Sequence, residues 1–74
     1  MQGKLTVIIE KDDYGYFAYC PELKGCHTQG ETFEEAMTNI KEAVELYIET
    51  LDPEEKVLLL NKDIYSTSLE VAVG

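Results

Sequence analysis

The hydrophobic pattern in the first quarter of the chain predicts two strands joined by a tight turn. Within residues 5–10 one side of the segment is entirely apolar, because every second residue from Leu5 to Ile9 is a leucine, valine or isoleucine. An aromatic-rich run follows at residues 16–20, and the intervening residues 12–15 have the composition of a turn. We therefore expect the two segments to form a β-hairpin.

A second turn is predicted directly after residues 16–20. Pro21 lacks an amide donor and biases Cys20 toward an extended conformation, so the strand is expected to end there. Glu22 to Gly25 can form the turn, because Gly25 is free to adopt a positive φ angle. Residues 26–29 are then expected to run back beside the preceding strand.

The pattern changes to a helical period after Gly30. Thr32 and Glu35 have the spacing of a capping box, with each side chain bonded to the other residue's amide. Apolar residues then recur at steps of three and four as far as Leu51, which predicts one broad apolar stripe packed on the sheet. The opposite line of this helix carries Glu35, Thr38, Glu42, Glu45 and Glu49. That line is either a solvated face or a docking stripe for a basic partner.

The C-terminal part of the chain is predicted to return to strand. Asp52 and Pro53 are typical of a second helix start, and residues 56–60 could continue that helix or form a short strand. Residues 64–73 alternate well, which predicts a long final strand. Its more apolar side carries Tyr65, Thr67, Leu69, Val71 and Val73.

These elements predict one α+β domain over residues 1–74. The expected fold is an antiparallel sheet of about four strands, in β-β-β-α-β order, with one long helix packed on one face. The second sheet face would expose Ile8 and the aromatic side chains Phe17 and Tyr19. An apolar face of that kind favours a homodimer or a higher homo-oligomer, and so does the short chain.

Charge narrows the choice of partners. The chain has 15 acidic residues against six lysines, with no arginine and a formal net charge of −9. Binding of nucleic acid depends largely on basic side chains that neutralise phosphates, so direct binding of DNA or RNA is not expected. Anionic membranes are disfavoured for the same reason, and a basic protein partner is favoured, although the charge could also serve solubility alone. The absence of a signal peptide and of a membrane-length apolar run predicts a soluble, cytoplasmic protein with reduced cysteines.

The chemistry of the side chains gives no catalytic, cofactor-binding or metal site. Cys20, Cys26 and His27 are the only soft metal ligands, and their spacing matches no zinc module. Cys26 and His27 are adjacent on an expected strand and should point to opposite faces, so they cannot form a nucleophile–base pair. We expect His27 at the surface or at an interface, and no enzymatic activity.

Several runs of the sequence, taken together, resemble the signature of HicB-like antitoxins. They are YCPELKGC at residues 19–26, TQGET at 28–32, EEA at 34–36 and NIKEA at 39–43. In that family the pattern is an aromatic residue followed by Pro-Glu-Leu-x-Gly-Cys, then x-Thr-x-Gly-(Asp/Glu)-Thr and a helix rich in Glu and Ala. The resemblance implies an acidic domain that covers a small basic RNase, a HicA-like toxin, and competes with its RNA.

Docking of such a partner is predicted to involve Glu42, Glu45 and Glu49 on the helix, together with Tyr14 and Glu22 in the turns. Many family members continue into a helix-turn-helix or ribbon-helix-helix domain, and because the sequence stops at Gly74, operator binding is not expected. The alternative function is an orphan homo-oligomer, a structural or ligand-binding module of the same fold without a toxin.

Overall fold

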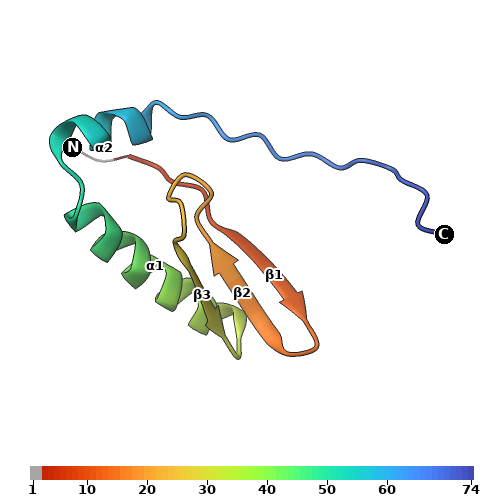
Figure 1. The fold of residues 1–74 in the computed structure, drawn as a ribbon. Helices are drawn as coiled ribbons and strands as arrows, with labels where there is room; N and C mark the ends of the chain where they lie inside the picture. Colours follow the sequence, from red (N-terminus) through yellow and green to blue (C-terminus); the bar gives the residue numbers. More distant parts are fainter. Residues whose placement is uncertain (1–2) are drawn as a thin grey trace.

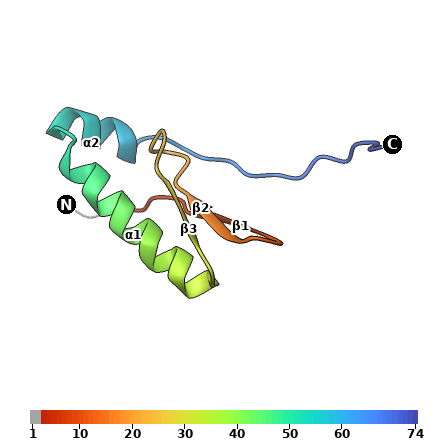
Figure 2. The ribbon, with the colours of Figure 1, turned by 60° about the horizontal axis from the view of Figure 1, so that its bottom comes forward.

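The computed structural model describes residues 3–74, which form three strands followed by two helices (Figure 1). In chain order these are β1 (Ile8–Asp12), β2 (Gly15–Tyr19), β3 (His27–Gly30), α1 (Phe33–Glu49) and α2 (Pro53–Leu60). The strands form one antiparallel sheet in the order β1-β2-β3. Figure 2 shows α1 packed along one side of this sheet. The α+β class and the β-β-β-α order of the first four elements are therefore confirmed.

The hairpin of β1 and β2 begins later than the sequence pattern predicted. In the register Ile8 pairs with Tyr19, and the chain turns away beyond β2 at Pro21. Leu5 and Val7 therefore have no strand beside them, and β1 begins at Ile8 rather than at residue 5. Their side chains still pack against the core, so the predicted apolar side of this segment is correct.

The turn between β2 and β3 closes as predicted. The Cys20 N–H donates to the Cys26 carbonyl, and the Leu23 N–H donates to the Cys20 carbonyl. Gly25 adopts a φ angle of 80°, which side chains other than glycine rarely tolerate. Leu23 is buried, as are Cys20 and Cys26 on either side of it in the sequence, so the turn contributes to the core as well as reversing the chain.

Close contact between β3 and α1 positions the helix on the sheet. A Cβ atom on Gly30 would lie 2.6 Å from the Ala36 nitrogen, so only glycine permits this approach. The side-chain amide of Asn39 donates to the Gln29 carbonyl over 2.8 Å and adds a direct link from α1 to β3. The resulting core contains Ala18, Cys20, Leu23, Cys26, Ala36, Ile40 and Leu59.

The start of α1 differs in one detail from the predicted capping box. The Glu35 N–H donates to the Thr32 hydroxyl over 3.0 Å, as expected. The Glu35 carboxylate, however, accepts from the Glu31 N–H rather than from the Thr32 N–H. The reciprocal pair forms instead at α2, where Asp52 and Glu55 each accept from the other's amide.

The structure has a second helix besides the predicted long one, because residues 53–60 form α2. Pro53 lies in its first turn, where its missing N–H has no cost, and the capping box fixes the start. Leu59 enters the core while Leu58 stays exposed. Neither helix within residues 3–74 is long and apolar enough to cross a membrane.

The predicted fourth strand over residues 64–73 does not form in the single chain. This segment leaves α2 and runs outward to the C-terminus without a neighbouring strand (Figures 1 and 2). Its side chains are exposed from Tyr65 onward, so its alternating pattern has nothing to pack against. The observed order is β-β-β-α-α, with three strands in the described part of the chain.

Substitution of Gly30 by alanine tests the contact between β3 and α1. We expect Gly30→Ala to lower the free energy of unfolding by about 1–3 kcal/mol, because the new methyl group forces α1 away from the sheet. Gln29→Ala is the matched control, since Gln29 is exposed and its backbone carbonyl is unchanged. Urea unfolding followed by circular dichroism measures both. Equal, small losses in the two variants would contradict the contact.

Candidate partner-binding surface

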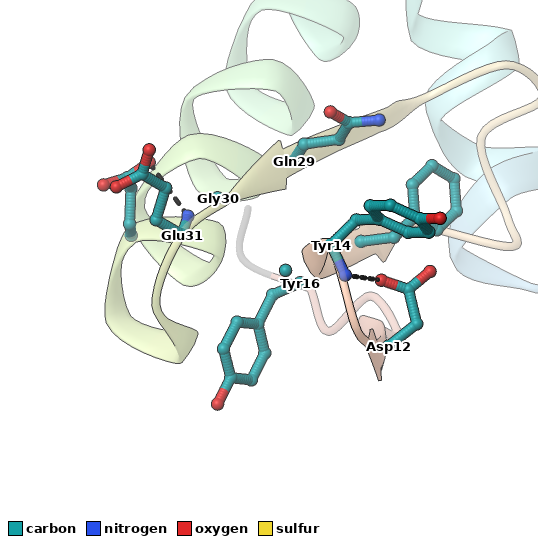
Figure 3. Close-up of a pocket in the computed structure, with 9 residues that line it drawn as sticks. Asp12, Tyr14, Tyr16, Gln29, Gly30 and Glu31 are labelled. Carbon is teal, nitrogen blue, oxygen red and sulfur yellow. Dashed lines mark hydrogen bonds between the residues drawn. The ribbon is translucent and has the colours of Figure 1, made fainter.

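A hollow lies beside the β1–β2 turn, where the end of β3 and the start of α1 come close to it. Asp12 and Tyr14 lie on one side of this hollow and Glu31 on the other (Figure 3). The Tyr14 N–H donates to Asp12 Oδ1 over 2.8 Å, which fixes the turn, while the Tyr14 side chain is 97% exposed. The hollow has a volume of about 360 Å³ and is open to solvent.

The lining of this hollow is acidic and aromatic. Asp12, Glu31 and Glu35 contribute carboxylates, and Tyr14 and Tyr16 contribute rings. Carboxylates bind guanidinium and ammonium groups, and aromatic faces attract the same cations. The hollow therefore has the chemistry to accept a lysine or arginine side chain from a partner.

The outer side of α1 continues the acidic character of the hollow. Glu42, Glu45 and Glu49 are all exposed. At 100° per residue they point to the side opposite Ile40, which is completely buried. Glu35 lies on the same side of α1, about two turns before Glu42, and it also lines the hollow, so it belongs to both regions. We call Asp12, Glu31, Glu35, Glu42, Glu45 and Glu49 together the acidic surface.

Glu22 lies elsewhere and makes internal contacts. Its Oε2 accepts from the Thr6 N–H over 2.9 Å, and its Oε1 accepts from the Cys20 thiol over 3.6 Å. Burial alone would raise the pKa of this carboxyl group, but the hydrogen bonds, chiefly from Thr6, outweigh it and hold the pKa below its ordinary value of 4.5. Glu22 thus binds the segment before β1, which has no strand partner of its own.

The five residues predicted to bind a partner are therefore not gathered at one place. Tyr14 is in the β1–β2 turn and Glu22 is in the β2–β3 turn, at opposite ends of β2. Tyr14 lies near the beginning of α1, whereas Glu22 lies near its end, in a hollow that Tyr47 and Leu51 also line. The helix glutamates lie on the outer side of α1 between these two ends.

Both cysteines are buried, and their thiols are expected to be unreactive. Cys20 is 2% exposed, and burial together with the nearby Glu22 charge raises the pKa of its thiol to about 11. Burial also raises the pKa of Cys26. Both thiols therefore stay protonated at neutral pH, which makes them poor nucleophiles and poor metal ligands. No group of three or more His, Cys, Asp or Glu side chains within residues 3–74 is arranged to hold a metal ion.

Aromatic residues cover the sheet face that α1 leaves open. The Phe17 ring centroid lies 5.7 Å from that of Tyr19 and 5.5 Å from that of His27. His27 is exposed and points away from the buried Cys26, as the alternation of a strand predicted. This open face is a second surface that could be covered in an assembly.

The sequence-based prediction missed the hollow, although it named Tyr14. The acidic residues that line the hollow are separated along the chain. Asp12 lies at the turn between β1 and β2, whereas Glu31 and Glu35 lie at the start of α1. Pairing of Tyr16 with Gly30 brings these segments together. The signal was present as two acidic, glycine-containing turns, but the strand register was needed to connect them.

The fold and the surface together define a small α+β domain with many exposed carboxylates and a formal net charge of −9. The chain belongs to the HicB-like antitoxins of bacterial toxin–antitoxin systems, since the model of that family matches residues 5–69.

Curated proteins similar to this chain include several from bacteria and archaea. A UPF0150 protein of Helicobacter pylori strain J99 is 47% identical over 68 residues, which cover 92% of this chain and 94% of that protein. A UPF0150 protein of Synechocystis is 68% identical over 47 residues, or 62% of this chain and 60% of its own length. One from Thermoplasma acidophilum is 57% identical over 49 residues, or 65% and 71% of the two chains. No solved structure matches this chain significantly.

Replacement of Glu22 by glutamine tests its structural role through pH. Because the folded-state pKa is depressed, the ionised carboxylate stabilises the fold fully above about pH 4.5, and this contribution is lost as the pH falls through the lowered pKa. Glu22→Gln should lower the unfolding free energy at pH 7 by about 1–2 kcal/mol and much less at pH 3.

Unfolding by urea at several pH values measures this difference. Glu70→Gln, which alters an exposed carboxylate outside the helices and the sheet, is the control and should change stability little at either pH. A loss for Glu22→Gln that is the same at pH 3 and pH 7 would show that the carboxylate charge is not what Thr6 binds.

Proposed function

We propose that this chain is an antitoxin-type binding protein that neutralises a small basic RNase of the HicA-like kind by covering its active surface. Family membership supports the antitoxin class. The observation that carries the proposal is the acidic surface, in which exposed carboxylates continue from the hollow at Tyr14 along the outer side of α1.

Competition with RNA explains why an acidic protein suits this role. An RNase must present basic side chains to the phosphates of its substrate. A protein surface of opposite charge is attracted to the same groups and, once bound, excludes RNA from them. The chain's formal net charge of −9 disfavours contact with the nucleic acid itself, so inhibition acts through the enzyme. This activity would take place in the cytoplasm, where the RNA is.

The contacts we propose divide by role. Tyr14 and the hollow beside it hold one basic side chain of the toxin, because an aromatic ring and three carboxylates line the same open hollow. Glu42, Glu45 and Glu49 steer the approach of the partner and contact it at the rim. Glu22 acts indirectly, by holding the β2–β3 turn and the segment before β1 in place.

An orphan homo-oligomer is the second candidate, and one observation favours it. The aromatic rings of Phe17 and Tyr19 lie on the open face of the sheet, where a second copy or an apolar ligand could cover them. Under this alternative the acidic surface serves solubility only. The two functions differ in whether a basic RNase encoded beside this chain binds it.

A titration of RNase activity tests the proposed function. The short basic protein encoded by the neighbouring gene is assayed for cleavage of a fluorescent RNA while this chain is added in known ratios. Cleavage should fall in proportion to the added chain and stop at a fixed whole-number ratio, because covering the active surface is stoichiometric. Unchanged cleavage at a tenfold excess of the chain would refute neutralisation.

Neutralising the helix glutamates should slow association with the RNase. The triple variant Glu42→Gln, Glu45→Gln, Glu49→Gln should associate roughly tenfold more slowly at low salt, and its rate should depend less on salt than that of the wild type. Its fold should be unchanged because all three side chains are exposed. Surface plasmon resonance at several salt concentrations measures both effects.

A matched control removes the same charge elsewhere. Glu10→Gln, Asp63→Asn and Glu70→Gln change three exposed carboxylates that lie outside the acidic surface. This control should associate nearly as fast as the wild type. Equal slowing by both triple variants would mean that only the total charge matters, and equal rates for all three proteins would mean that α1 is merely a solvated face.

A further inference from the structure

The C-terminal segment has the composition of a strand but no partner in the single chain. We call residues 64–74 the arm. Tyr65 is 89% exposed, Leu69 is 83% exposed and Val73 is 92% exposed. The arm contains no proline and only one charged residue, Glu70. Extended segments of β-branched and aromatic residues with little charge pair readily with other strands, so a permanently bare arm would favour aggregation.

A groove on the body of the molecule has the complementary character. It lies between the segment before β1 and the inner flank of α1, and it has a volume of about 460 Å³. Its apolar lining consists of Leu5, Val7, Met37, Ile40, Val44 and Ile48. We call it the apolar groove. It is present because α1 packs mainly over β3 and β2 and leaves the β1 side of the same face uncovered.

The edge of the sheet next to this groove is also unpaired. In the strand order β1-β2-β3, β1 pairs on one side only, with β2, within the described residues. A free strand edge presents N–H and C=O groups that can bond to an added strand. The groove and the edge therefore offer what a strand requires, a row of backbone partners and an apolar surface for alternate side chains.

We propose that the arm of one copy of this chain adds as a strand to the β1 side of a second copy. Leu69, Val71 and Val73 then enter the apolar groove of that copy, and the arm of the second copy does the same in return. The exchange gives a two-fold symmetric dimer in which each sheet gains a strand from its partner.

The direction and the reach of the arm favour a second copy over the arm's own body. In Figures 1 and 2 the arm leaves α2 and extends away from α1, the helix that forms one wall of the groove. Ten extended residues span about 33 Å, which exceeds the molecule's two shorter extents of 28 and 18 Å. An arm of this length can cross to a neighbouring molecule.

The charge distribution permits this contact between two acidic chains. Each copy carries a formal net charge of −9, but the arm contributes only one of the 15 acidic residues. Contact through two nearly neutral arms therefore avoids most of the repulsion between the bodies. Glu45 lines the edge of the apolar groove beside Lys41, whereas Glu42 and Glu49 lie outside its lining. The proposal does not depend on the proposed toxin.

The mass of the protein in solution tests the exchange. Sedimentation equilibrium at micromolar concentration should give twice the chain mass of 8.4 kDa for the wild type. Leu69→Asp with Val71→Asp should give the monomer mass and keep the helical circular dichroism signal of α1 and α2, because the arm is exposed and lies outside the folded body of the single chain. Only the strand signal that the exchange adds should be lost. Ser66→Asp with Ser68→Asp introduces the same two charges on the other side of the arm and should leave the dimer intact. A monomeric wild type, or a Leu69/Val71 variant that remains dimeric, would overturn the proposal.

Isotope-filtered NMR on a mixture of labelled and unlabelled chains then identifies the donor of the strand. The proposal requires intermolecular contacts between the methyl groups of Leu69 or Val71 and those of Leu5, Val7 or Val44. Finding these contacts only within one chain would show that the arm folds back onto its own body. Finding intermolecular contacts only at Phe17 and Tyr19 would show that the open sheet face forms the dimer instead.

Discussion

The close approach of α1 to β3 is the constraint on which the rest of this structure depends. Gly30 has no side chain, so the backbone at Ala36 can lie directly against it, where a Cβ atom would come within 2.6 Å of the Ala36 nitrogen. With the helix this close, Ala36 and Ile40 are fully buried and the opposite side of α1 must face solvent. The position of one glycine thereby decides which carboxylates form the acidic surface. It also leaves the β1 side of the sheet uncovered, where the apolar groove lies.

Carboxylates of this acidic chain have two distinct functions. Glu22 faces inward, where it accepts the Thr6 N–H and replaces the strand partner that residues 5–7 lack. The carboxylates around the hollow and on α1 are exposed instead. Two of them, those of Asp12 and Glu35, accept from nearby backbone N–H groups. A glutamate can therefore either stabilise the fold or remain available to a partner. Which of the two it does depends on whether the fold places hydrogen-bond donors beside its carboxylate, as it does for Glu22.

Most of the fold could be predicted from local sequence signals. The strand run before Pro21, the positive φ angle at Gly25 and the helical stripe from Ala36 onward each depend on a few neighbouring residues, and each was correct. The second helix was ambiguous because the run of four apolar residues at 57–60 fits a short helix or a short strand, and the capping box of Asp52 and Glu55 decides it. Alternation in residues 64–73 indicates an extended conformation and two different sides, but periodicity contains no information about which strand lies beside them.

The candidate site was harder to predict than the fold, for a physical reason. The helix glutamates follow from a single period and were found, whereas the hollow at Tyr14 requires the register between β2 and β3 to bring Glu31 close to Asp12. The inward role of Glu22 likewise depends on a contact 16 residues away in the sequence. Long-range contacts of this kind bring side chains together that no local sequence motif would connect.

We propose that the acidic surface is the side of the molecule that meets a basic partner. In an NMR titration, the amide signals of the ¹⁵N-labelled chain are followed while an unlabelled basic RNase of the HicA-like kind, the partner that we propose, is added. We expect amide shift changes concentrated at residues 12–16 and 29–35 and along the outer side of α1. Changes confined to β2 and His27 on the open sheet face, or to residues 64–74, would contradict it.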